Sequence, residues 1–379
     1  MRWLGFACGL VICLATAGSV IKSLVLPRGQ TSRLGVFVGR RVVRSAFVVL
    51  ANRVDTYEAK DRILALSGPM SLLALLSVWM VLFFCGFALL LWPLVSDFGL
   101  ALRESGSSML TLGFAGTLGV GPTIVHFIAA ATGLLVVALQ VAYLPTLYSS
   151  FNRRETLVTL LQSRAGAPAW GPEIMMRAQR VNLLESLPAL YAEWERWAAD
   201  VAESHTTYPV LVWFRSPHPL RSWVVALLAV MDSAALYLSL SPNRAPVEAR
   251  LCLRMGFTAL RDIADVVHIP YDSDPLPNEP IDLTYEEFEG GVERLGATGF
   301  ELERSAEEAW PHFQGWRVNY ESICYLLADV TVAVPGPWSG PRRHLPELQI
   351  IPQRPPDRRP NDPQDRDDPK TADQSRWRV

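Results

Sequence analysis

Residues 105–121 read SGSSMLTLGFAGTLGVG and separate two long uncharged segments, residues 63–96 and 121–152. Each segment exceeds the roughly 20 apolar residues that a helix needs to cross a bilayer core of about 30 Å. The stretch between them is too short to span, yet it is more apolar and glycine-rich than an ordinary surface loop. Non-helical backbone is tolerated at membrane depth only where protein buries it or where it lines a water-filled cavity. The sequence therefore predicts a spanning helix, a re-entrant half-helix over residues 103–110, a turn, and a second spanning helix.

The composition is typical of a membrane protein with a second, more polar half. Hydrophobic residues make up 50% of the chain and charged residues 19%, and the mean hydropathy is +0.19. The apolar residues concentrate in the first 150 positions, which indicates two regions with different solvents. The net charge of −2 argues against a nucleic-acid partner. The five cysteines form no CxxC pair and no zinc spacing, and nothing else in the sequence calls for a cofactor.

The charges of the short connecting segments predict the orientation. Residues 27–65 contain eight basic and three acidic residues, whereas residues 97–120 contain one basic residue, Arg103. The eight basic residues are Arg28, Arg33, Arg40, Arg41, Arg44, Arg53, Lys60 and Arg62. Because basic residues in short loops mark the cytoplasmic side, we expect a multi-pass protein of the plasma (inner) membrane whose C-terminal half is cytoplasmic.

The apolar N-terminus has two interpretations. It is either an uncleaved transmembrane anchor over residues 1–26 or a signal peptide that is cleaved near Ala15–Ala17. Cleavage would leave the basic segment 27–65 outside, so the charge bias favours the anchor. Within that segment, residues 34–52 resemble a basic amphipathic helix. Such a helix can lie on membrane lipid through its arginines, or it can dock as a connector on the C-terminal half.

The five residues after the predicted half-helix carry a family resemblance. They are Thr111, Leu112, Gly113, Phe114 and Ala115. Their order resembles the TVGYG loop, four copies of which supply the carbonyl oxygens of a potassium filter. With its flanking spans, the module over residues 66–152 resembles the two-transmembrane pore-loop potassium-channel family of bacterial ion channels. The filter is degenerate, because leucine, phenylalanine and alanine replace the valine, tyrosine and second glycine of the family pattern.

This resemblance implies passive conduction of a monovalent cation by a homotetramer, in which each chain supplies one loop of the filter. The negative end of the half-helix dipole would point at the cavity and favour a cation. Gly133 follows Gly113 by twenty residues, near the position of the gating hinge in the inner helix. His126 is the one ionisable residue of the last span, and its place near the outer interface favours a histidine that reaches water.

The C-terminal half reads as a helical cytoplasmic domain over residues 153–335. A helical pattern over residues 173–204 contains Pro188, which should kink or divide it. Further helices are predicted over residues 246–267 and 316–331, and a strand over residues 208–214. Residues 222–241 are long enough to span, but Asp232 at their middle favours a buried helix in which this carboxylate is paired.

The remaining sequence gives little chemistry. Residues 336–379 are rich in proline and mixed in charge, which predicts a disordered tail. No nucleotide-binding or metalloprotease motif and no nucleophile–base pair is evident, so we expect no enzyme. Two functions fit the sequence: a potassium-channel-like pore subunit, and a non-conducting membrane-anchored scaffold or sensor that acts through its helical domain. In the second, the loop is a re-entrant turn that conducts nothing.

Overall fold

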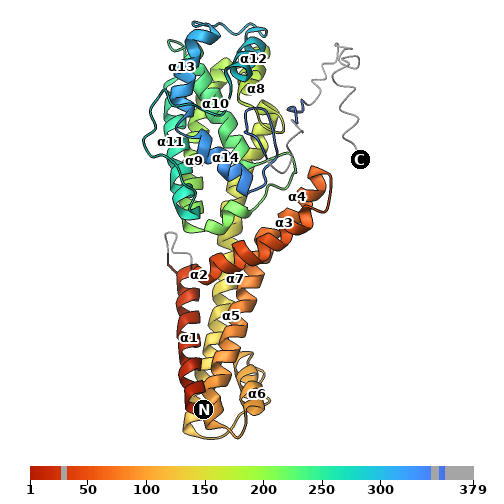
Figure 1. Cartoon of the computed structure of the whole chain (residues 1–379), viewed down its shortest axis with the longest axis vertical. Helices are drawn as coiled ribbons and strands as arrows, with labels where there is room; N and C mark the ends of the chain where they lie inside the picture. Colours follow the sequence, from red (N-terminus) through yellow and green to blue (C-terminus); the bar gives the residue numbers. More distant parts are fainter. Residues whose placement is uncertain (27–31, 343–349, 355–379) are drawn as a thin grey trace.

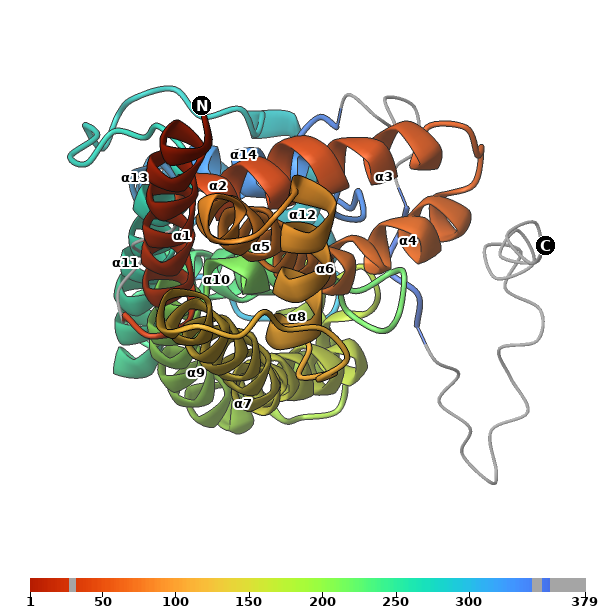
Figure 2. The same ribbon diagram turned by 90° about the horizontal axis from the view of Figure 1, so that it is seen from below.

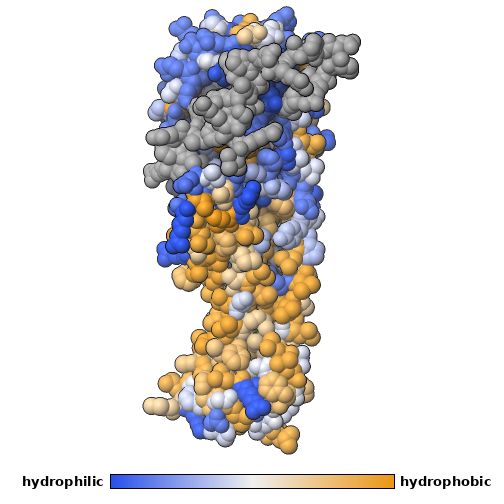
Figure 3. Space-filling model, turned by 90° about the vertical axis from the view of Figure 1, so that its right-hand side faces the viewer, coloured by the Kyte–Doolittle hydropathy of each residue, from blue (hydrophilic) through white to orange (hydrophobic). Residues whose placement is uncertain are grey.

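The computed structural model describes residues 1–26, 32–342 and 350–354. These residues form helices and no strand, which confirms the predicted all-α membrane protein. The molecule is elongated, with a slender bundle at one end and a broader helical domain at the other (Figure 1). The surface of the bundle is mainly apolar and that of the helical domain mainly polar (Figure 3). The two solvents that the composition predicts therefore correspond to the two ends of the molecule.

Three long helices form the bundle: α1 (Arg2–Leu24), α5 (Ser67–Leu91) and α7 (Val120–Ala165). They lie side by side in both views, and the short helix α6 (Phe98–Met109) lies beside them (Figures 1 and 2). Small residues bring α1 against α5. A Cβ atom on Gly9 would lie 2.6 Å from the Gly86 carbonyl oxygen. Close helix packing through small residues is a main source of association inside a bilayer, so α1 is an integral part of this bundle.

The helix α7 links the bundle to the helical domain without a break over 46 residues. The predicted module boundary at residue 152 falls inside it. Beyond that point Arg154 is fully buried and donates hydrogen bonds to the carbonyl oxygens of Leu211 (2.8 Å) and Phe214 (2.7 Å). Its charge is paired with Glu155 at 2.7 Å. Charge-assisted bonds of this kind are stronger than neutral ones and fix α7 in the domain.

The basic segment crosses the boundary between bundle and domain. It consists of α2 (Arg33–Val36), the π-helix η1 (Phe37–Arg44), α3 (Ser45–Ala51) and α4 (Tyr57–Ala65). The predicted amphipathic helix over residues 34–52 is thus present. Its Arg40 donates to the Val267 carbonyl oxygen of the helical domain at 3.2 Å, as the docking alternative predicts. The neighbouring helix α4, outside the predicted range, also contacts this domain. Asp61 pairs with Arg215 of the helical domain at 2.5 Å, and Arg215 donates to the Val332 carbonyl oxygen at 3.0 Å.

The helical domain is built around α10 (Trp223–Leu240), an apolar helix of which 94% of the residues are buried inside the protein. The prediction of a buried helix is confirmed, because Asp232 pairs with Arg317 at 2.6 Å and accepts a hydrogen bond from the Tyr320 hydroxyl at 2.9 Å. The helices around it are α8 (Gly171–Arg180), α9 (Leu187–Thr207), α11 (Val247–Val267), α12 (Tyr285–Gly296), α13 (Ala306–Arg317) and α14 (Glu321–Val330). Two short 3-10 helices, η3 (Leu184–Ser186) and η4 (Pro209–Trp213), flank α9.

Several predictions for this domain need correction. The predicted strand over residues 208–214 is wrong, because Pro209 opens η4 instead. The predicted helix over residues 316–331 is divided between α13 and α14. The predicted tail over residues 336–379 begins too early. The Trp338 side chain is 5% exposed and packs against Trp170 with ring centroids 5.7 Å apart. Residues 343–349 and 355–379 lie outside the described residues.

Candidate functional site

The helix α6 begins and ends with local hydrogen bonds that the sequence supplies. The Asp97 carboxylate accepts a hydrogen bond from the Leu100 amide at 3.0 Å, which is a standard N-terminal cap. At the other end the Leu112 amide donates back to the Ser107 carbonyl oxygen at 2.8 Å. Inside the helix, the Ser105 hydroxyl donates to the Phe84 carbonyl oxygen of α5 at 2.8 Å. These contacts hold α6 against α5 as a separate short helix.

The end of α6 lies deep in the bundle. A Cβ atom on Gly133 would lie 2.1 Å from the Met109 carbonyl oxygen, so only glycine fits at this contact. Gly133 is thirteen residues beyond the start of α7, which corresponds to about 20 Å along a helix that rises 1.5 Å per residue. The predicted arrangement of a span, a re-entrant half-helix, a turn and a second span is therefore present. The structure gives Gly133 a packing role, and its gating role stays a prediction.

The predicted filter residues lie in the loop between α6 and α7. Thr111 to Phe114 are exposed in the isolated chain, and the exposed fractions of Leu112 and Phe114 are 59% and 57%. Thr111 has a φ of +55° and Gly113 a φ of +70°. A non-glycine residue in this left-handed region costs roughly 1–2 kcal/mol, and strain of this kind clusters at functional sites. Ala115 is partly buried, and its amide donates to the Ser107 hydroxyl at 3.1 Å.

A buried carboxylate that was not predicted from the sequence lies behind this loop. Glu104 of α6 is 1% exposed, and its Oε1 accepts a hydrogen bond from the Thr117 hydroxyl at 2.5 Å. Its Oε2 lies 3.1 Å from Nε2 of His126 on α7. His126 is therefore paired with a carboxylate, a partner that was not predicted from the sequence. Glu104 follows Arg103 in the sequence and reads there as a surface charge. His126 could have indicated that a partner such as Glu104 lies nearby, since ionisable groups at membrane depth usually have a partner.

We expect Glu104 and His126 to be energetically coupled. Replacing Glu104 with glutamine keeps the shape of the side chain but removes its charge. The free energy needed to open the loop should therefore fall by about 1–3 kcal/mol. Hydrogen exchange of the amides in residues 111–119 should become faster. A double-mutant cycle with His126→Gln should give a coupling of about 1 kcal/mol or more, because groups in contact are not additive. Additive effects in this cycle would contradict the pairing.

Comparison with known proteins finds a similarity to an uncharacterized membrane protein. The chain is 24% identical over 239 residues to the uncharacterized membrane protein YdjJ of Bacillus subtilis (strain 168), an alignment that covers 58% of this chain and 67% of YdjJ. No family model matches the chain, and no solved structure matches it. The chain is thus similar to another membrane protein.

The helical domain offers no comparable site. Within the described residues no group of three or more His, Cys, Asp or Glu side chains could hold a metal ion. The fully buried His205 lies 3.0 Å from the Arg154 guanidinium. Burial, and then the charge of Arg154, hold the pKa of His205 well below its usual range. His205 is therefore neutral and accepts a hydrogen bond from Arg154. This contact is structural, because it joins α7 to α9.

Proposed function

We propose that this chain is a subunit of a passive cation pore that resembles a potassium channel. The loop from Thr111 to Ala115 lines the pore, and four copies of the chain form it. The observation that carries the proposal is that the carbonyl oxygens of the loop lack hydrogen-bond donors. Within the described part of the chain, no carbonyl oxygen from residue 111 to residue 118 accepts a hydrogen bond. Unpaired carbonyl groups at membrane depth require water or an ion as their partner.

The direction of α6 supports a cation as that partner. The C-terminal end of α6 lies at the depth of Gly133, next to the unpaired carbonyl groups. The C-terminal end of a helix carries a partial negative charge, which favours a cation. Arg103 is the basic residue of α6, and its guanidinium lies 5.5 Å from the centre of the Phe114 ring. This contact places the Arg103 charge beside the Phe114 ring.

The surface of the isolated chain supports assembly. Leu118 is 96% exposed, and α7 leaves large apolar residues uncovered, including Phe127 at 73% and Leu134 at 67%. A single loop cannot enclose an ion, whereas four loops around a shared axis can. We therefore propose a homotetramer whose loops face one another. We also propose that it lies in the plasma membrane with the helical domain in the cytoplasm, because the basic segment lies at that end of the bundle (Figure 1).

Ion flux into liposomes that contain the purified protein tests the proposal, with K⁺ compared with Na⁺. Two glycine-to-alanine variants in the same loop provide a matched pair. Gly113 needs a φ of +70°, so Gly113→Ala should cost roughly 1–2 kcal/mol in the loop and lower the flux about tenfold. At Gly116 the added Cβ atom would meet the His126 ring at 3.7 Å, an ordinary contact, so Gly116→Ala should conduct normally.

The outcomes separate the two functions. Flux that Gly113→Ala lowers and Gly116→Ala leaves unchanged would establish the loop as the pore, and the ratio of the two cations would give its selectivity. Absence of flux from a folded protein would contradict the pore and favour a membrane-anchored scaffold or sensor that acts through its helical domain.

A further inference from the structure

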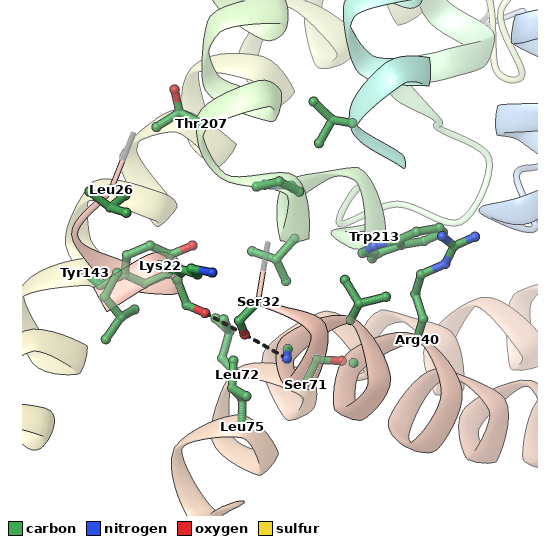
Figure 4. A pocket seen from close by; sticks show the side chains of 18 of the residues that line it. Lys22, Leu26, Ser32, Arg40, Ser71, Leu72, Leu75, Tyr143, Thr207 and Trp213 are labelled. Carbon is green, nitrogen blue, oxygen red and sulfur yellow. Dashed lines mark hydrogen bonds between the residues drawn. The ribbon is translucent and has the colours of Figure 1, made fainter. Parts of the chain in front are cut away.

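A cavity lies where the apolar bundle meets the helical domain (Figure 4). Its volume is about 150 Å³. Leu72, Leu75 and Trp79 of α5 form its wall on the bundle side, and Trp213 and Val267 contribute from the helical domain. A cavity of this size holds a benzene-sized apolar group. It can therefore take several carbons of an acyl chain, whose remainder would continue into the bilayer.

Two polar groups of α7 face this cavity without a partner. Gln140 lines it and is 5% exposed, yet its amide makes no hydrogen bond within the described residues. The Tyr143 hydroxyl, one helical turn further on, likewise lines the cavity without a hydrogen bond to any residue that the structure describes. The cavity therefore offers hydrogen bonds to a ligand that carries carbonyl or hydroxyl oxygens.

The rim of the cavity is basic. Lys22 and Arg40 approach from opposite sides, and Trp213 lies beside Arg40 (Figure 4). The Arg40 guanidinium donates one hydrogen bond, to the Val267 carbonyl oxygen at 3.2 Å, and lies 5.8 Å from the centre of the Trp213 ring. No other N–H group of this guanidinium donates to a residue that the structure describes, so these groups can bind a ligand. None of the described residues that line the cavity is acidic. The rim therefore favours an anion.

We propose that this cavity binds one anionic phospholipid. The phosphate lies at the basic rim that Lys22 and Arg40 form, an ester carbonyl oxygen accepts a hydrogen bond from Gln140, and part of an acyl chain fills the apolar floor. The order of these groups, from charge through ester to hydrocarbon, matches the order of the lining from the rim inward. The proposal goes beyond the pore and does not depend on it. In this proposal the basic segment contributes Arg40 to a specific lipid site. Its other basic residues can still be attracted to anionic headgroups in general.

Binding of fluorescent phosphatidylglycerol to the full-length protein in detergent micelles tests the site. Unlabelled phosphatidylglycerol should displace the probe at a concentration about tenfold or more below that of phosphatidylcholine, since the latter carries no net charge. Inorganic phosphate should not displace it. Arg40→Gln should weaken binding about fivefold. Its neighbour Arg41 is exposed and does not line the cavity, so Arg41→Gln is the matched control and should have little effect.

Two further variants test the interior of the cavity without changing its charge. Gln140→Leu removes the buried amide and should weaken binding about fivefold. Gly39→Leu fills space, because a Cβ atom at Gly39 meets only Ser71, at 3.8 Å, and it should weaken binding at least as much. Equal losses from Arg40→Gln and Arg41→Gln, or unchanged binding in Gln140→Leu, would overturn the proposal in favour of general attraction to headgroups. Displacement by inorganic phosphate would overturn the lipid as the ligand.

Discussion

Replacing Arg317 with methionine is expected to lower the free energy of unfolding of the helical domain by about 3–5 kcal/mol. The Arg317 side chain is fully buried and pairs with Asp232 at 2.6 Å and Glu321 at 2.7 Å. It also donates to the Trp338 carbonyl oxygen at 2.6 Å. Methionine would fill most of the space but would leave two carboxylates buried without their cation. The loss therefore comes from uncompensated charge, more than from packing.

Urea unfolding of the full-length protein in detergent, followed by tryptophan fluorescence, measures this effect. With a slope of roughly 1–3 kcal/mol per molar urea, the midpoint should fall by more than about 1 M. Arg244→Met is the matched control. Arg244 pairs with Glu301, but the two side chains are 55% and 70% exposed, so this ion pair contributes at most about 1 kcal/mol. Equal shifts for the two variants would show that the buried network is not what stabilises the domain.

Replacing Gly133 with alanine is expected to push α6 away from α7. The added Cβ atom would lie 2.1 Å from the Met109 carbonyl oxygen and 2.9 Å from its Cγ atom. The carbonyl oxygen is a backbone atom, so it cannot move unless the end of α6 moves with it. Overpacking of this kind typically costs about 1–3 kcal/mol. Hydrogen exchange of the amides in residues 107–113 should accelerate about tenfold or more, and the proposed cation flux should be lost.

Gly18→Ala in α1 is the matched control, because no heavy atom lies within 4 Å of its added Cβ atom. Alanine is the better helix former by about 1 kcal/mol, so this variant should exchange no faster than the unaltered protein. If Gly133→Ala left exchange unchanged and altered only the opening of the pore, Gly133 would act as the hinge that the family resemblance implies. The contact with Met109 would then not be essential.

The parts of the fold that follow from local patterns could be predicted from the sequence. The uncharged segments before and after residues 105–121 gave α5 and α7, and the 3.6-residue period over residues 246–267 gave α11 almost to the residue. The buried state of α10 followed from the cost of Asp232 at the centre of an apolar helix. Each of these features depends on residues within one continuous segment of the chain.

The parts that depend on distant contacts could not be predicted in this way. Glu104 and His126 are 22 residues apart, and only the packing of α6 on α7 brings them together. The need for glycine at position 133 arises from Met109, which lies on another helix. Trp338 stands in a proline-rich stretch that resembles disordered sequence, and its burial comes from partners such as Trp170 and Arg317. The pattern of a single sequence can indicate that a residue such as His126 needs a partner, but it does not specify which distant residue that partner is.

The continuity of α7 has a mechanical consequence. A helix of 46 residues is about 69 Å long, and this one is clamped near its far end by Arg154. A displacement of the helical domain that tilts or turns this end must also move Gly133, and with it the end of α6, unless the helix bends between them. Pro145 lies in that interval and lacks the N–H group that would complete the helical ladder. The stiffness of the helix at Pro145 therefore sets how much of a domain movement reaches the loop.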